Sequence, residues 1–218
     1  MTDMSKEEQP KLSKTYWLIA YALIGAVAGY IGADLASGGA NGEALVDLTL
    51  SQIAALAVGA ILVICGVIVG LGAASPRLGK SMGMVEDHEQ WEDEKNLMRL
   101  SAVGSGAFGL LMVLLALVEP LGLAADAVLL GAIVALVGLV FYTCWRVLHE
   151  YDELWHEVNA ETCVIAVYLM FAIGGAWSIA AHLGFVGAPA PLDLITLLTA
   201  ASLVGAVRAV QKRGMLED

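Results

Sequence analysis

Charged side chains are scarce in this sequence, and none lies in the middle of its long apolar runs. Asp, Glu, Lys and Arg make up 15% of 218 residues, whereas about a quarter is usual for a soluble domain. Ion-coupled transporters and proton relays usually place ionisable groups at the middle depth of the membrane. Proline is also missing from the middle of the runs, where it often breaks the helices of transporter binding sites. Both absences argue against ion-coupled transport.

Sequence motifs for catalysis, metal binding or nucleic-acid binding are also scarce. The HExxH pattern of zinc peptidases is absent, so the helical histidine pair of those enzymes is missing. The three cysteines, Cys65, Cys144 and Cys163, form no CxxC pair, and we interpret them as small apolar filler residues. The net charge of −11 argues against nucleic acid as a partner.

What the sequence does have is apolar blocks. Apolar residues make up 59% of the chain, and a membrane-crossing helix needs about 20 of them in succession. We predict an all-α membrane protein with six transmembrane helices in three hairpins, embedded in a lipid bilayer. The helical domain covers residues 15–211, between polar tails at 1–14 and 212–218. The predicted spans are residues 16–33, 50–71, 100–118, 126–145, 162–183 and 192–207.

The basic residues give the predicted topology its orientation. If the N-terminus is cytosolic, all 11 Lys and Arg residues fall on the cytosolic side of the membrane. Cytosolic loops carry such an excess of basic residues. We therefore expect both termini in the cytosol and a multi-pass location in the bacterial cytoplasmic (inner) membrane. The basic residues are Lys6, Lys11, Lys14, Arg77, Lys80, Lys95, Arg99, Arg146, Arg208, Lys212 and Arg213.

The polar stretch between the fourth and fifth spans holds the best candidate metal ligands. No Gly or Pro lies between Val140 and Ile173, so the fourth helix is expected to continue for two turns before it reverses near Asn159. On such a helix His149, Glu153 and His156 would share one face, and imidazole with carboxylate suits zinc, iron or manganese. The alternative is a solvated or interfacial turn without a cofactor, and we prefer this interpretation.

A second candidate surface combines acidic and aromatic residues of two predicted cytosolic segments. Acidic runs are usually solvated faces, but here they could dock a basic partner. The predicted docking residues are Glu86, Glu89, Trp91, Glu92, Asp152 and Trp155.

We interpret the chain as a non-enzymatic structural or accessory subunit that binds other membrane chains or self-associates. Two alternatives stay open. One is a small oligomeric channel or solute transporter. The other is a membrane-embedded, metal-dependent enzyme built on the histidine face described above.

The distribution of basic residues makes the topology testable. Reporter fusions at Asn41, Gly122 and Gly187 should report the outside of the membrane, and fusions at Gly83 and Asp218 the cytosol, because the loops without Lys or Arg are the translocated ones. The measurement is the ratio of a periplasmic to a cytosolic reporter activity. A cytosolic signal at Asn41 would contradict the whole arrangement.

Overall fold

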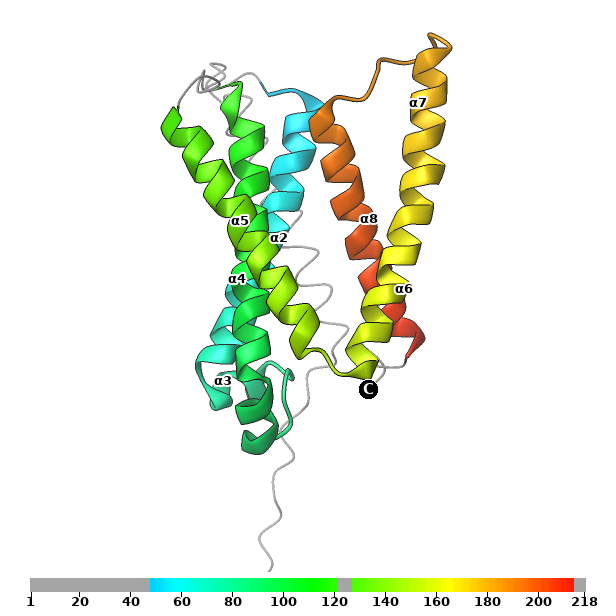
Figure 1. Cartoon of the computed structure of the whole chain (residues 1–218). Coiled ribbons are helices and arrows are strands. Elements are labelled where there is room, and N and C mark those ends of the chain that lie inside the picture. Colours follow the sequence, from blue (N-terminus) through cyan, green and yellow to red (C-terminus); the bar gives the residue numbers. More distant parts are fainter. Residues whose placement is uncertain (1–47, 121–126, 214–218) are drawn as a thin grey trace, which may run out of the picture.

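The computed structural model describes residues 48–120 and 127–213, and the predicted first span, 16–33, lies outside them. The described chain is helical without strands, and five of its helices are long and apolar enough to cross a membrane (Figure 1). One of these five is the continuous run of α6, η2 and α7. The elements are α2 (Leu50–Ala74), α3 (Pro76–Ser81), α4 (His88–Val118), α5 (Ala127–Glu150), α6 (Glu153–Leu169), the π-helical turn η2 (Met170–Gly174), α7 (Gly175–His182) and α8 (Pro191–Lys212).

Side-chain caps define where the helices begin. The Thr49 hydroxyl accepts a hydrogen bond from the Gln52 amide at 3.3 Å, and the Gln52 side chain accepts one from the Thr49 amide at 2.8 Å. This reciprocal pair satisfies two backbone N–H groups at the start of α2. Asp193 has a similar role in α8, where its carboxylate accepts a hydrogen bond from the Ala190 amide at 2.7 Å. The observed helices therefore begin at residue types that favour helix starts.

The expectation of one continuous helix from the fourth span to Asn159 is wrong. Helix α5 ends at Glu150 and α6 begins at Glu153. The Asp152 carboxylate accepts a hydrogen bond from the Trp155 amide at 2.9 Å, which caps the new helix. A chain can thus reverse without Gly or Pro when a carboxylate satisfies the free amides of the next helix.

Close contact between α2 and α4 forms the most extensive helix pair in the described structure. A Cβ atom on Gly109 would lie 2.6 Å from the Gly59 carbonyl oxygen, and one on Gly66 would lie 2.8 Å from the Ala102 carbonyl oxygen. The Ser105 hydroxyl also donates to the Leu62 carbonyl at 2.9 Å. Small residues let the two backbones approach until their atoms touch.

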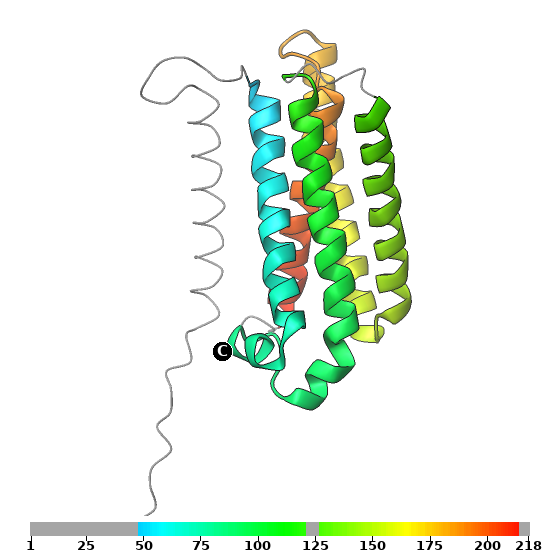
Figure 2. The same cartoon turned by 90° about the vertical axis from the view of Figure 1, so that its left-hand side faces the viewer.

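A second close pair joins α6 to α8. A Cβ atom on Gly205 would lie 2.8 Å from the Thr162 carbonyl oxygen. At one end of the pair, Glu161 accepts hydrogen bonds from Lys212 at 2.8 Å and from Arg213 at 2.7 Å. The α6–α8 pair meets the α2–α4 pair mainly through α8 and α2, whereas α5 packs on α4 (Figures 1 and 2).

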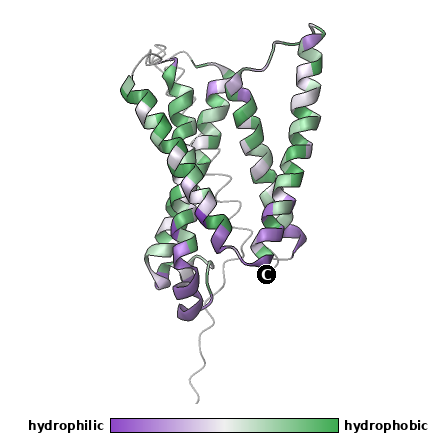
Figure 3. Cartoon of the chain, in the orientation of Figure 1, coloured by the Kyte–Doolittle hydropathy of each residue, from purple (hydrophilic) through white to green (hydrophobic). Residues whose placement is uncertain are grey.

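Polar residues gather at one end of the bundle, which we name the charged end (Figure 3). It contains α3, the start of α4, the turn between α5 and α6, and the last turn of α8. Every Lys and Arg within residues 48–120 and 127–213 lies in or beside these segments. The one-sided distribution of Lys and Arg expected from the sequence therefore holds in the described part of the structure.

The close α2–α4 contact predicts that adding one methyl group to it will lower the stability of the fold. Gly109→Ala should lower the free energy of unfolding by about 1–3 kcal/mol, because the new Cβ would overlap backbone atoms of α2. Gly138→Ala is the matched control, since a Cβ there meets nothing within 4 Å. Unfolding in detergent, followed by circular dichroism, measures both. Equal stability of the two variants would contradict the tight contact.

Candidate functional site

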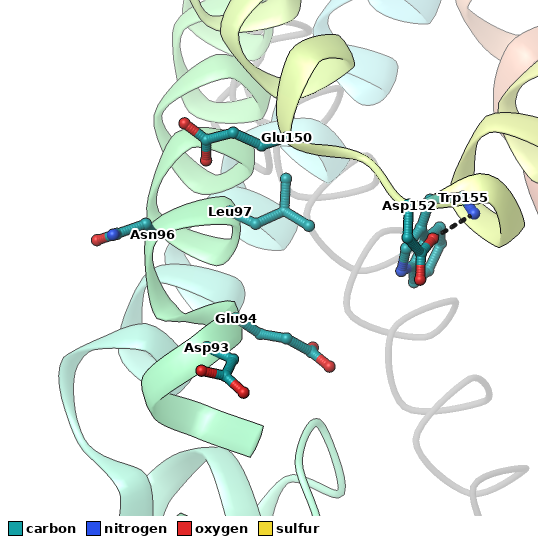
Figure 4. A pocket seen from close by; sticks show the side chains of 7 residues that line it. All are labelled: Asp93, Glu94, Asn96, Leu97, Glu150, Asp152 and Trp155. Carbon is teal, nitrogen blue, oxygen red and sulfur yellow. Dashed lines mark hydrogen bonds between the residues drawn. The ribbon is translucent and has the colours of Figure 1, made fainter. Parts of the chain in front are cut away.

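An open cavity of about 360 Å³ lies at the charged end, between α4 and the α5–α6 turn (Figure 4). Four of the seven lining side chains are carboxylates, and none is basic. We name this cavity the acidic pocket. Its lining residues are Asp93, Glu94, Asn96, Leu97, Glu150, Asp152 and Trp155.

The carboxylates of the acidic pocket differ in how they are engaged. Glu150 pairs with Arg146 at 2.8 Å, and Glu94 accepts a hydrogen bond from the Gln90 side chain at 2.9 Å. Asp152 caps α6, while Asp93 is exposed to solvent. Carboxylates gathered in a concave surface concentrate a negative potential there. The pocket is therefore suited to a cationic group.

The structure divides the predicted docking residues among several places. Asp152 and Trp155 line the acidic pocket, and 38% of Trp155 is exposed. Glu86 and Glu89 are exposed near the start of α4, outside the pocket lining. Glu92 pairs with Lys95, whose hydrogen bond lowers the pKa of the Glu92 carboxyl.

Trp91, also a predicted docking residue, is buried, with 8% of its surface exposed. Its indole N–H donates to the Gly72 carbonyl oxygen at 3.1 Å, at the end of α2 where backbone carbonyls lack helical partners. The Lys95 ammonium lies 5.1 Å from its ring centre. In this structure Trp91 joins α2 to the start of α4, and it offers little surface to a partner.

The predicted metal ligands lie on two different helices. His149 is in the last turn of α5, where its Nδ1 lies 2.8 Å from the Trp145 carbonyl oxygen. Glu153 and His156 belong to the first turns of α6, beyond the reversal. Across residues 48–120 and 127–213, no three His, Cys, Asp or Glu side chains are grouped to hold a metal ion. The metal hypothesis therefore has only the sequence behind it.

Tyr151, in the turn between those helices, packs against residues of both candidate sites. Its ring stacks on Trp155 with centres 6.1 Å apart and meets the edge of His156 at 5.9 Å. Burial raises the pKa of the Tyr151 phenol, so it stays neutral at physiological pH. These contacts fix the direction in which Trp155 faces the pocket.

Two short patterns resemble enzyme motifs but occur in a different structural context. Residues 104–109 have the GxGxxG spacing and residues 79–83 the GxSxG spacing. The first lies inside α4, whereas a dinucleotide-binding loop joins a strand to a helix. In the second, the Ser81 hydroxyl donates to the Leu78 carbonyl at 2.9 Å, at the end of α3 rather than on a strand-to-helix elbow. Neither arrangement supports catalysis.

The sequence interpretation missed several lining residues. Asp93, Glu94 and Glu150 are evident as acids in the sequence, but residues 93 and 150 are far apart in sequence. They line the same cavity only because α5 packs on α4. A comparison with known protein families, curated proteins and solved structures finds no match for this chain.

The buried position of Trp91 separates it from Trp155 in a simple experiment. Trp91→Phe should lower the free energy of unfolding by about 1–3 kcal/mol, because the buried Gly72 carbonyl loses its donor. Trp155→Phe should change stability by less, since its ring is partly exposed. Chemical unfolding monitored by circular dichroism gives both values. A larger loss for Trp155→Phe would contradict the structural role of Trp91.

Proposed function

We propose that the protein is a non-enzymatic accessory subunit of a membrane complex, with its charged end in the bacterial cytosol. In this proposal the acidic pocket binds a basic segment of a partner chain. The partner is itself a membrane protein with a Lys- or Arg-rich juxtamembrane segment. Such segments are common on the cytosolic side of membrane proteins.

The observation that carries the proposal is the one-sided charge of the acidic pocket. Four carboxylates line it. Among the residues that the structure describes, the one base paired with any of them is Arg146, which binds Glu150 within α5. Complementary charges across an interface steer association and select partners. Trp155 and Leu97 add apolar surface to the same cavity, and aromatic residues are enriched at interfaces.

The membrane-crossing part also leaves surface for neighbours. In α5 just Thr143 and Val147 are buried, while Phe141 is 73% exposed. In a bilayer such a face suits lipid or another transmembrane helix. A helix packed along one side therefore fits a subunit that joins a larger assembly.

The experiment neutralises the pocket without disturbing the fold. The triple variant Asp93→Asn, Glu94→Gln, Asp152→Asn removes three charges, and Asn preserves the cap on α6 because it caps as well as Asp. Glu92→Gln is the control, since it neutralises a neighbouring acid outside the pocket lining. The full chain is extracted from its own membranes in lipid nanodiscs, and chains that copurify in stoichiometric amount are identified.

The expected result is one stoichiometric membrane partner that dissociates in high salt and is lost from the triple variant but kept by Glu92→Gln. Loss from both variants or from neither would show that the pocket is not the contact. Solute flux through the protein reconstituted alone in liposomes would favour the channel alternative. A stoichiometric transition metal would favour the enzyme.

A further inference from the structure

The fifth predicted span, which is the continuous run of α6, η2 and α7, loses its packing contacts halfway along its length. Its first part, α6, packs on α8 through Gly205 and the Glu161 ion pairs. Its last part, α7, has no buried residue and makes no extensive contact with any described helix beyond η2. Figure 1 shows α7 diverging from α8 toward the end opposite the charged end. The contact with α8 thus stops in the middle of a continuous helix.

The change occurs at the π-helical turn, Met170–Gly174. Gly174 is the buried residue of this turn, and a Cβ atom on it would lie 3.3 Å from a Leu197 methyl group. Next to it, Gly175 has open space around its α-carbon. π-Helical turns and glycines are two of the recognised causes of helix bending, and a glycine backbone is the least restricted of all. The π-helical turn and the glycine pair therefore lie together at the point where packing against α8 ends.

Beyond the turn, α7 and the loop after it form a unit of their own. The Phe185 amide donates to the Ala180 carbonyl at 3.0 Å, and Gly184 has a φ of 80°. This pattern is the Schellman motif that closes a helix end. The Trp177 indole N–H then donates to the Gly187 carbonyl at 3.0 Å, which ties the loop back to α7. We name residues 175–187 the outer arm.

The face of α8 that α6 covers becomes more exposed toward the level of the π-helical turn. Gly205, Ala201 and Leu198 follow one another at helical spacing along this face. Ala201 is 4% exposed, whereas Leu198 is 46% exposed. On the fifth span, Val158, Ala166 and Gly174 are the buried residues of the facing stripe. The contact between the fifth predicted span and α8 therefore loosens as it approaches Gly174 and Leu197, where it ends.

We infer that the outer arm is hinged at Gly174–Gly175 and swings between two positions relative to the start of α8, which begins at Pro191. The ion pairs and the Gly205 contact hold α6 in place while the arm moves. Eight residues of α7 span about 12 Å, so a bend of about 20° would move the tip by about 4 Å. The fifth span would then open and close one side of the bundle without any change at the charged end.

The test measures distances between spin labels in the full chain, reconstituted in lipid nanodiscs. The native cysteines are replaced by serine, and labels are placed at Ile179→Cys and Ile195→Cys to report α7 against α8. A second pair, Val164→Cys and Val204→Cys, reports α6 against α8. All four positions are exposed. Pulsed dipolar spectroscopy gives each distance distribution, and circular dichroism confirms that the labelled proteins are folded.

The label at Ile179 is about 7.5 Å beyond the hinge, so a hinge predicts that the α7–α8 distribution has a second population shifted by about 2–3 Å. The α6–α8 distribution should be single and narrow. Gly175→Ala should shift the α7–α8 populations toward one state, because alanine restricts the backbone and meets nothing within 4 Å. Gly138→Ala in α5 is the matched control and should leave both distributions unchanged. A single α7–α8 distribution as narrow as the reference, before and after Gly175→Ala, would overturn the inference.

Discussion

The backbone contact between α2 and α4 is the constraint on which the rest of the described structure depends. Gly59, Gly66 and Gly109 bring carbonyl oxygens and α-carbons of the two helices together. Lipid tails are as apolar as the side chains, so packing rather than water exclusion must hold such helices. With α4 fixed against α2, Gly104 offers the notch into which Thr143 of α5 fits. The acidic pocket follows, because α4 and the end of α5 supply its walls.

The polar contacts of the charged end complete this framework. Trp91 satisfies a carbonyl at the end of α2, and Asp152 caps α6 immediately after α5 has ended. Glu161 bridges to Lys212 and Arg213, although exposed ion pairs contribute about 1 kcal/mol or less each. The ion pairs therefore fix the direction of the helix ends more than they add stability. They leave the carboxylates of the acidic pocket without a basic neighbour among its lining residues.

The two helix pairs differ in how far along their length they are held. Contact between α2 and α4 extends from the hydrogen bond that Gln52 donates to Glu119 at 3.3 Å to that between Trp91 and Gly72 near the charged end. Contact between the fifth span and α8 stops at Gly174 and Leu197. A bundle that is tightly packed on one side and partly unpacked on the other can move in one place while its charged end keeps its geometry.

The sequence by itself determined the helical class, five of the predicted spans and the gathering of basic residues at one end. Long apolar runs leave the backbone no other way to satisfy its hydrogen bonds in a bilayer. The reversal at Asp152 rests on a local helix cap that the sequence interpretation missed. Tertiary structure alone decided the burial of Trp91 and the position of Asp93 and Glu150 around one cavity. Each depends on which helix packs beside which, and periodicity along one chain carries no information about neighbours across the bundle.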